Sequence, residues 1–380
     1  MTAKKRKILF FSCLCLFLLL APSAVLYTQG YRFDSQTKRI TQTGGIFLKT
    51  WPKQANVYID GKIKDKTDFF FGSVLIENLL PRPYRVEIRK DSFYPWKKTL
   101  DVAEKQVSEA KNVILFPQNP QLSPLAEAVN DAWFVPDEKQ IILLKESKGS
   151  WFLEALDLQT NATRTLIAEK DVSTAGAELI NVSFPQKNNS LLIEANIQSK
   201  IKYFSLDLGQ PSAKLQKAEK PQLAENIYDD YKFSLLDGIL YLYNKDQKKY
   251  EKFFEQLKGF ELSPDSKKIA YFSDNEIWTI YLENTNEEVN KKAGENSLLI
   301  RLSEKITDCL WLDSNHVAFN ANGALKISEL DARDRLNIVD LAQIKNAIGN
   351  RQEKIFWNGN EKRMYILTNN ILSRSAILVP

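Results

Sequence analysis

Hydrophobic and polar residues are patterned differently in three successive parts of the chain. At the N-terminus, four cationic residues at positions 4–7 precede an uncharged apolar run from Ile8 to Tyr27. A helix rises about 1.5 Å per residue, so this run would span about 30 Å, the thickness of the hydrocarbon core of a bilayer. The pattern therefore predicts one transmembrane helix over residues 8–27.

The charges around this run predict its orientation. Because the cations precede the span, the positive-inside rule places residues 1–7 in the cytoplasm as a short stub. Everything after about residue 28 is then extracytoplasmic, beginning with a juxtamembrane segment over residues 28–43. A cleaved signal peptide is the alternative. The only small-residue segment that could serve as a signal-peptidase site is Ala-Pro-Ser-Ala at residues 21–24, and its proline is unfavourable for cleavage. A retained single-pass anchor in the cytoplasmic membrane is therefore favoured.

Residues 44–116 show an apolar period of two, which is typical of half-buried strands. Tyr84, Val86 and Ile88 alternate with charged residues. Asp60-Gly61 predicts a tight turn, because both central positions of such a turn favour positive φ. Strands are predicted over residues 45–51, 55–59, 74–80, 84–88 and 96–102. No segment of helical period separates them, so this part is predicted to be a small antiparallel β-sandwich.

The same part carries a recognisable motif. Residues 52–62 read Pro-Lys-Gln-Ala-Asn-Val-Tyr-Ile-Asp-Gly-Lys, and residues 79–88 and 92–96 continue the pattern. These segments resemble the PEGA domain family. Asp68 stands where the family has a turn proline, and Arg82 and Ser92 stand where it has glycine, the residue that most freely takes positive φ. The resemblance implies an extracytoplasmic binding or spacer module without catalytic residues.

From residue 117 onward an aromatic-apolar strand, a polar turn and a strongly apolar strand recur. The six copies begin near Trp133, Val182, Phe233, Phe260, Leu310 and Phe356. Their mean spacing of about 44 residues is the blade length of a four-stranded propeller. The sequence Ser-Pro-Asp-Ser-Lys-Lys-Ile-Ala at residues 263–270 resembles the TolB-like and Trp-Asp-type propeller repeat. Residues 117–380 are therefore predicted to form a β-propeller.

The spacing of the copies leaves the blade number between five and seven, with six favoured, because two copies lie about 29 residues apart and others about 49. An elongated array of β-sandwiches is the structural alternative. Residues 331–348 have apolar positions at helical spacing, which predicts a short surface helix. The apolar residues 375–379 are predicted to form a strand that pairs with the 120–145 region and joins the two ends of the propeller. The chain is thus all-β after its anchor.

Composition excludes several classes of function. Without residues 4–7 the chain has 48 basic and 47 acidic residues, so no nucleic acid partner is expected. Three cysteines (Cys13, Cys15 and Cys309) make neither a disulfide scaffold nor a four-thiolate zinc site, and one histidine makes no two-histidine metal site. We assign no catalytic, cofactor-binding or metal residue and expect no cofactor. Cys309 and His316 are predicted to be structural.

These observations predict a non-enzymatic, envelope-anchored binding or scaffolding protein. The chain as a whole resembles membrane-anchored bacterial PEGA-domain proteins, which implies a cell-envelope protein or glycan as ligand. We expect no hydrolase domain after the propeller. Trp51, Trp96 and Trp151 lie near turns, where they would form either a recognition face or, as favoured, part of the core.

Two alternatives remain open. The first is an exported carbohydrate-active enzyme that uses acidic residues on the propeller face, for which Asp229-Asp230 and Glu287-Glu288 are the adjacent pairs. Two carboxyls about 5–10 Å apart with aromatic neighbours would favour it. The second is a secreted binder from which residues 1–24 have been cleaved.

Overall fold

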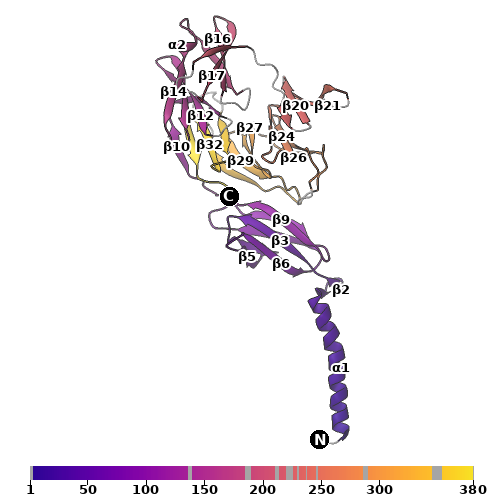
Figure 1. Ribbon diagram of the computed structural model, residues 1–380. Helices are drawn as coiled ribbons and strands as arrows, with labels where there is room; N and C mark the ends of the chain where they lie inside the picture. Colours follow the sequence, from indigo (N-terminus) through magenta and orange to yellow (C-terminus); the bar gives the residue numbers. More distant parts are fainter. Residues whose placement is uncertain are drawn as a thin grey trace. The chain divides into compact units, whose positions relative to one another are not determined.

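The architecture is that of a computed structural model, shown in Figure 1. It describes residues 3–135, 139–184, 190–209, 214–219, 226–228, 231–236, 238–244, 247–285, 290–344 and 353–379. The described chain is almost entirely β-structure after one N-terminal helix. Its backbone contacts define two units: unit 1, residues 1–116 with 331–337, and unit 2, residues 117–330 with 338–380.

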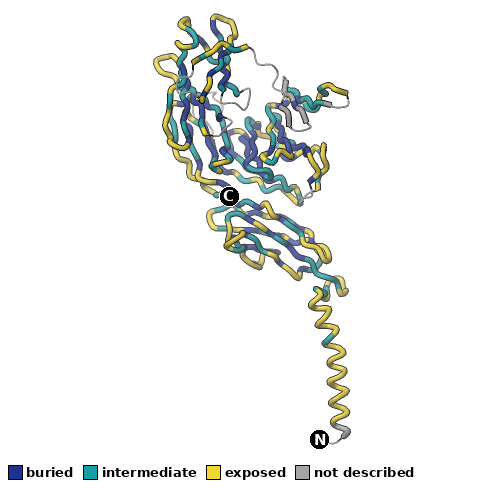
Figure 2. The backbone as a smooth tube through the Cα atoms, in the orientation of Figure 1, coloured by how far each residue is buried: buried dark blue, intermediate teal, exposed yellow. Residues whose placement is uncertain are grey.

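The first element of unit 1 is helix α1 (Ala3–Thr28). Its segment Arg6–Thr28 is 23 residues long with a mean hydropathy of 2.5, and none of it is buried. Figure 2 shows this exposure along the helix. The length and composition suit a membrane span, and a signal sequence meets the same criteria. A two-stranded hairpin, β1 (Tyr31–Asp34) and β2 (Arg39–Gln42), follows in the segment predicted to be juxtamembrane.

Two sheets then share one hydrophobic core. The three-stranded sheet has the order β6-β3-β9, with bounds Ser73–Leu79, Gly44–Trp51 and Val107–Ile114. The four-stranded sheet has the order β5-β4-β7-β8, with bounds Lys62–Lys66, Asn56–Ile59, Pro83–Arg89 and Trp96–Asp101. All five predicted strands are present. The prediction of a purely antiparallel unit is wrong, because β3 and β9 pair in parallel.

The Asp-Gly turn of the PEGA-like motif and two positions where the sequence departs from that motif, Arg82 and Ser92, have the following geometry. Asp60 and Gly61 take positive φ values of 49° and 79°, as the Asp-Gly turn predicts. Arg82 lies 2.8 Å from the Asp60 carboxylate, which also accepts a hydrogen bond from the backbone N–H of Arg85. Ser92 adopts φ 69°, a conformation that glycine takes more easily.

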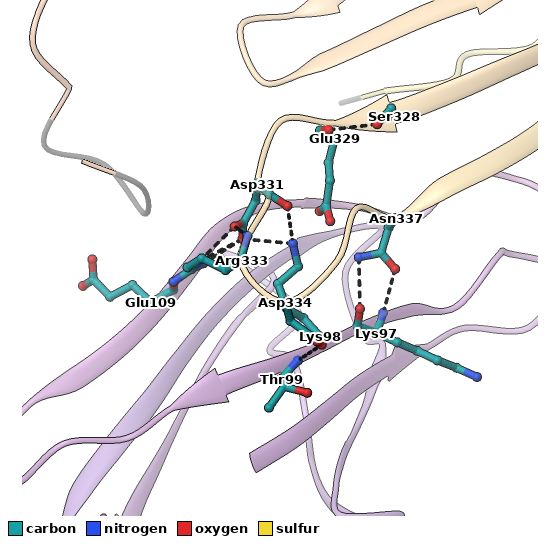
Figure 3. A network of polar contacts seen from close by, with 10 residues as sticks. All are labelled: Lys97, Lys98, Thr99, Glu109, Ser328, Glu329, Asp331, Arg333, Asp334 and Asn337. Carbon is teal, nitrogen blue, oxygen red and sulfur yellow. Dashed lines mark hydrogen bonds and ion pairs between the residues drawn. The ribbon is translucent and has the colours of Figure 1, made fainter. Parts of the chain in front are cut away.

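Residues 331–337, here called the strap, complete unit 1 although they come from the far part of the sequence. Strand β8 is an edge strand, and the strap bonds to its free backbone groups (Figure 3). The Asn337 side chain accepts from the N–H of Lys97 at 3.0 Å and donates to its carbonyl at 3.1 Å. The Asp334 carboxylate accepts from the N–H of Thr99 at 2.8 Å. The strap thus covers an edge that would otherwise be open to strand pairing.

A buried ion pair holds the strap at its other end. The Lys98 side chain is fully buried, and its ammonium lies 3.3 Å from the Asp331 carboxylate and donates to the Asp331 carbonyl. Arg333 donates to both carboxylate oxygens of Asp331 and to the carbonyl of Glu109. Burial alone would raise the pKa of Asp331, but the hydrogen bonds and charges of Arg333 and Lys98 outweigh it and lower that pKa.

The helix predicted over residues 331–348 is wrong. The strap has no helical turn, and Ile338–Gln343 forms strand β30, paired with β29 (Ala324–Glu329). Over so short a segment, apolar residues two and three positions apart fit both the helical period and the strand period. Pairing with β29 makes this segment a strand. Ile348 lies outside the described residues.

The described part of unit 2 contains six four-stranded antiparallel sheets. The first sheet consists of β11 (Val129–Phe134), β12 (Gln140–Ser147), β13 (Ser150–Asp157) and β14 (Thr163–Ala168). The second consists of β15 (Glu178–Ser183), β16 (Ser190–Ile197), β17 (Lys200–Asp207) and β18 (Gln216–Ala218). The third consists of β19 (Asn226–Tyr228), β20 (Tyr231–Leu236), β21 (Ile239–Asn244) and β22 (Lys249–Phe254). The last three are β23 Gly259–Leu262, β24 Lys268–Phe272, β25 Glu276–Tyr281, β26 Asn296–Arg301; β27 Ile306–Asp313, β28 His316–Ala321, with β29 and β30; and β10 Leu122–Ala126, β33 Ile371–Ser375, β32 Arg363–Thr368, β31 Lys354–Asn358. A short helix, α2 (Glu169–Val172), follows β14.

This order of consecutive up-and-down sheets is propeller-like. Four of the six sequence copies correspond to the first and second strands of a sheet, and the copy near Phe356 corresponds to β31 and β32, an edge strand and its neighbour. The copy near Phe233 corresponds instead to β20 and β21, the second and third strands of its sheet. That offset of one strand accounts for the short spacing to the next copy, and each copy still belongs to its own sheet.

The two ends of unit 2 meet in one sheet, where β10 pairs antiparallel with β33. The predicted pairing of the C-terminus with the 120–145 region is therefore present. Its predicted position, residues 375–379, is wrong, since the strand is Ile371–Ser375 and residues 376–379 follow it without strand structure. β10 is an edge strand with an irregularity after Pro124, a place where sheets tolerate proline.

Candidate binding pocket

A pocket of about 660 Å³ lies among one edge strand from each of four sheets of unit 2. β11, β23, β27 and β31 contribute to its wall, together with residues of the turns that follow the last three of these strands. Up-and-down sheets bring corresponding strand ends to the same side, which is why residues far apart in sequence meet here. The volume is that of a site for a small molecule or a side chain.

Glu261 lines this pocket from β23. Its side chain reaches the open space of the pocket, and its Oε2 accepts a long hydrogen bond of 3.4 Å from the backbone N–H of Trp311. The Trp311 indole donates to the Glu261 carbonyl at 3.0 Å, which fixes the neighbouring strands β23 and β27 to each other. Glu261 as a whole is exposed to the pocket space. The protein packed around its carboxyl and the nearby charge of Asp308 raise the pKa of Glu261 to about 8.

Asp308 is the second pocket carboxyl and comes from β27. It accepts hydrogen bonds from the backbone N–H groups of Cys309, at 3.0 Å, and Ile355, at 3.3 Å. Burial raises the pKa of Asp308 to about 6, although these bonds and the charge of Lys354 act in the opposite direction. Lys354 itself lies 2.6 Å from Asp131. Among the described residues, neither Glu261 nor Asp308 has a cation in ion-pair contact.

Asp313 is a third acid at the pocket, but it is already paired. His316 is buried, and its Nδ1 lies 3.0 Å from both carboxylate oxygens of Asp313. Burial would raise the pKa of Asp313, but His316 holds it below its usual range. This pair lies at the β27–β28 turn, and the structural role of His316 stays a prediction.

Aromatic side chains form much of the remaining wall. Phe134 and Phe356 line the pocket with their ring centroids 5.4 Å apart, and Phe134 also packs on Tyr365 at 5.2 Å. Trp357 lies beside Phe356 on β31, and it also lines the pocket. Two carboxyls without ion pairs and an aromatic wall are features of a ligand site rather than of a packed interior.

The other residues that the sequence singled out lie elsewhere. Trp96 and Trp151 are buried, and the Trp151 indole donates to the carbonyl of Ala177. Trp51 is half-buried against Phe93, with ring centroids 6.3 Å apart. Cys309 is buried, and burial raises the pKa of its thiol well above the usual value. The acid pairs at 229–230 and 287–288 lie outside the described residues.

Sequence reasoning missed both pocket carboxyls. One feature of the sequence could have pointed to them. Glu261 stands between Phe260 and Leu262 in an apolar strand, at a place where a propeller strand normally packs apolar residues. In the part of the chain that the structure describes, no three His, Cys, Asp or Glu side chains gather to hold a metal ion.

The raised pKa of Glu261 predicts a pH-dependent effect on stability. A carboxyl whose pKa is higher in the folded state destabilises the fold increasingly as pH rises from about 4.5 to about 8. Glu261→Gln is therefore expected to raise the melting temperature more at pH 8 than at pH 5, and only slightly, because Glu261 is exposed and solvent screens part of the effect. Calorimetry of the full chain at both pH values measures this, with the exposed Glu283→Gln as control. An equal change at the two pH values would contradict the expectation.

No family model matches the chain, and no curated protein matches it. Among solved structures, it is similar to an auxiliary nutrient binding protein from Bacteroides thetaiotaomicron VPI-5482, with 10% identity and a TM-score of 0.40 over 85% of this chain and 90% of that chain. It is also similar to TolB from Acinetobacter baumannii, with 16% identity and a TM-score of 0.33 over 68% of this chain and 62% of that chain.

A third similar structure is the β-propeller domain of Myceliophteria thermophila Cps50 (Swd1), with 12% identity and a TM-score of 0.37. That likeness covers 67% of this chain and 98% of that chain. The propeller-like description of unit 2 rests on the sheet order of the chain itself.

Proposed function

We propose that the chain is a single-pass, envelope-anchored binding protein without enzymatic activity. In this proposal α1 is retained in the cytoplasmic membrane with residues 1–7 in the cytoplasm. Residues 44–116 form a PEGA-like spacer, and residues 117–380 form a six-bladed propeller outside the membrane. The ligand is a molecule of the cell envelope, a protein or a glycan, that binds in the propeller pocket.

The anchor part of the proposal is supported by the exposure of α1. None of the segment Arg6–Thr28 is buried against the rest of the chain, so its apolar side chains have no protein core to enter. Exposed apolar surface of that extent is unfavourable in water and favourable in a bilayer. The cations at positions 4–7 favour a cytoplasmic N-terminus.

The binding part is carried by a single observation, the aromatic-lined pocket in which Glu261 and Asp308 form no ion pair with any described residue. Ionisable groups with raised pKa values cost stability, and such costs are typical of functional sites. The pocket walls come from rigid strands of four sheets, which suits a preformed site.

A carbohydrate-active enzyme is the second candidate, favoured by the same two acids. A carboxyl with a pKa of about 8 beside one with a pKa of about 6 is the combination used by a general acid and a carboxylate partner. A turnover screen on envelope glycans tests it, with Asp308→Asn as the inactive control. Product formation by the unaltered chain alone would favour the enzyme, and absence of product from every glycan would count against it.

Protease treatment of intact cells that produce the full chain tests the topology. A C-terminal epitope is expected to disappear while a cytoplasmic marker protein stays whole. Mass spectrometry of the mature N-terminus then separates a retained anchor, which keeps residues 1–27, from a cleaved secreted binder. An epitope that stays protected until the membrane is permeabilised would refute the extracytoplasmic placement.

A further inference from the structure

We propose that the pocket binds an organic cation, an alkylammonium or guanidinium group, between the carboxylates of Glu261 and Asp308 and against the aromatic wall. The proposal deepens the proposed function, because it rests on the pocket being the binding site. The cation belongs either to a free small molecule or to a lysine or arginine side chain of an envelope protein.

The charge balance of the pocket points to a cation. Glu261 and Asp308 face it from β23 and β27, and in the described residues no ion pair satisfies either carboxyl. The charged neighbours are otherwise engaged: Asp313 pairs with His316, and Lys354 pairs with Asp131. Lys362 lines the rim in the turn after β31 with an exposed side chain, and it is not among the groups that shift either pKa.

The aromatic wall favours an organic cation over a bare metal ion. Cations lie favourably over aromatic faces, and Phe134, Phe356 and Trp357 line the same pocket as the carboxyls. A calcium ion needs about six to eight oxygen ligands within about 2.6 Å, which two carboxyls in a pocket of about 660 Å³ do not supply. A guanidinium or ammonium group with a carbon body fills the space and keeps the carboxylates paired.

Protonation provides a signature that a neutral ligand would lack. At neutral pH Asp308 is mostly ionised, and Glu261 is mostly protonated, as their pKa values of about 6 and 8 require. The buried thiol of Cys309 stays neutral, because its pKa is raised further. A cation that binds both carboxylates must displace the Glu261 proton. Its affinity therefore rises with pH, by about tenfold per unit between pH 6 and 8, and levels off above pH 8.

The test is calorimetric titration of the full chain in detergent micelles with two matched probes, benzylguanidinium and the neutral benzylurea. They share size and shape, and the guanidinium keeps its charge throughout the pH range. Benzylguanidinium is expected to bind at least about tenfold more tightly than benzylurea at pH 8, with the predicted rise between pH 6 and 8. Titration in buffers of different ionisation enthalpy is expected to show about one proton released per cation at pH 7.

Two isosteric variants locate the effect. Asp308→Asn and Glu261→Gln are each expected to weaken benzylguanidinium about 10- to 100-fold while leaving benzylurea unchanged. Glu261→Gln is also expected to reduce the rise between pH 6 and 8 to about twofold, the part that Asp308 contributes. The control is Glu283→Gln, an exposed carboxyl that pairs with Lys267, which should change neither probe.

Further probes distinguish the two sources of the cation. An acetylated and amidated Gly-Arg-Gly peptide that binds as tightly as benzylguanidinium supports a protein side chain, whereas binding of the free probe alone supports a small molecule. Equal binding of benzylurea, binding of a methyl glycoside instead, or no heat from benzylguanidinium at millimolar concentration would each overturn the cation proposal. None of these outcomes alters the protease result, so the anchored topology is judged separately.

Discussion

Asp331→Asn is expected to destabilise unit 1 by about 3 kcal/mol, the lower end of the cost of breaking a buried ion pair. The Lys98 side chain is completely buried and that of Asp331 is 9% exposed, so solvent does not replace the lost carboxylate charge. Two hydrogen bonds moderate the loss, because Lys98 still donates to the Asp331 carbonyl and Arg333 to the Glu109 carbonyl. Chemical unfolding of the full chain in micelles measures the change.

Hydrogen exchange shows whether the strap is released. Amides of residues 96–101 and 331–337 are expected to lose protection in Asp331→Asn. The matched control is Asp334→Asn, the same change in the same strap, where the new amide oxygen still accepts from the Thr99 N–H and the site is exposed. Similar small effects from both variants would show that the buried pair does not hold the strap.

The contribution of Asp331 to the stability of unit 1 falls as the pH falls. The folded state lowers the pKa of Asp331, so its stabilising contribution is present above the unfolded value of about 3.8 and is lost as pH falls below it. The strap is therefore expected to stay in place from neutral pH down to about pH 4.

Local pattern predicted the strands of unit 1 because each of them buries one face. In β7 the buried residues Tyr84, Val86 and Ile88 alternate with exposed or half-buried ones, which is the period that the sequence displays. Strand β5 is exposed at every position, and the buried residues of β9, Ala110 and Val113, are three apart. Neither strand has a period of two to detect, so both were missed.

The strap could not be predicted from the local sequence pattern, for a different reason. Its hydrogen bonds to the first part of unit 1 join residues more than 220 positions apart, such as Lys97 with Asn337 and Thr99 with Asp334. Nothing in a run of polar residues distinguishes a strap from a solvated loop, since the partner that orders it lies in another part of the chain.

The candidate site was only partly accessible from sequence. The repeat pattern predicted the sheets whose edge strands form the pocket, but it did not predict which side chains meet there. Glu261 and Asp308 come from different copies, 47 positions apart, and an isolated acid in each strand looks like ordinary variation. The adjacent acids that the sequence did suggest, such as Asp229-Asp230, are neighbours along the backbone, whereas Glu261 and Asp308 line one pocket from two different strands.

Deletion of residues 371–380 is expected to unfold unit 2 while unit 1 stays folded. β33 lies between β32 and β10, so its loss separates the two ends of the unit and opens two strand edges. Leu372, Leu378 and Val379 are at most 2% exposed. Burial of each such side chain contributes about 1.5–3 kcal/mol, and the total is comparable to the whole stability of a typical domain. The residues of unit 1, the strap included, all precede the deletion.

Two single substitutions separate loss of packing from loss of chain length. Leu372→Ala removes a side chain with no exposed surface and is expected to cost about 2–5 kcal/mol. Ile377→Ala, in the same terminal segment but 52% exposed, is expected to change stability by less than about 0.5 kcal/mol. Calorimetry follows the melting of unit 2, and hydrogen exchange of β3 and β7 reports on unit 1. If the truncated chain melted like the full one, the pairing of β10 with β33 would contribute nothing to holding the sheets together, and the joining of the two ends would have to be sought in other contacts.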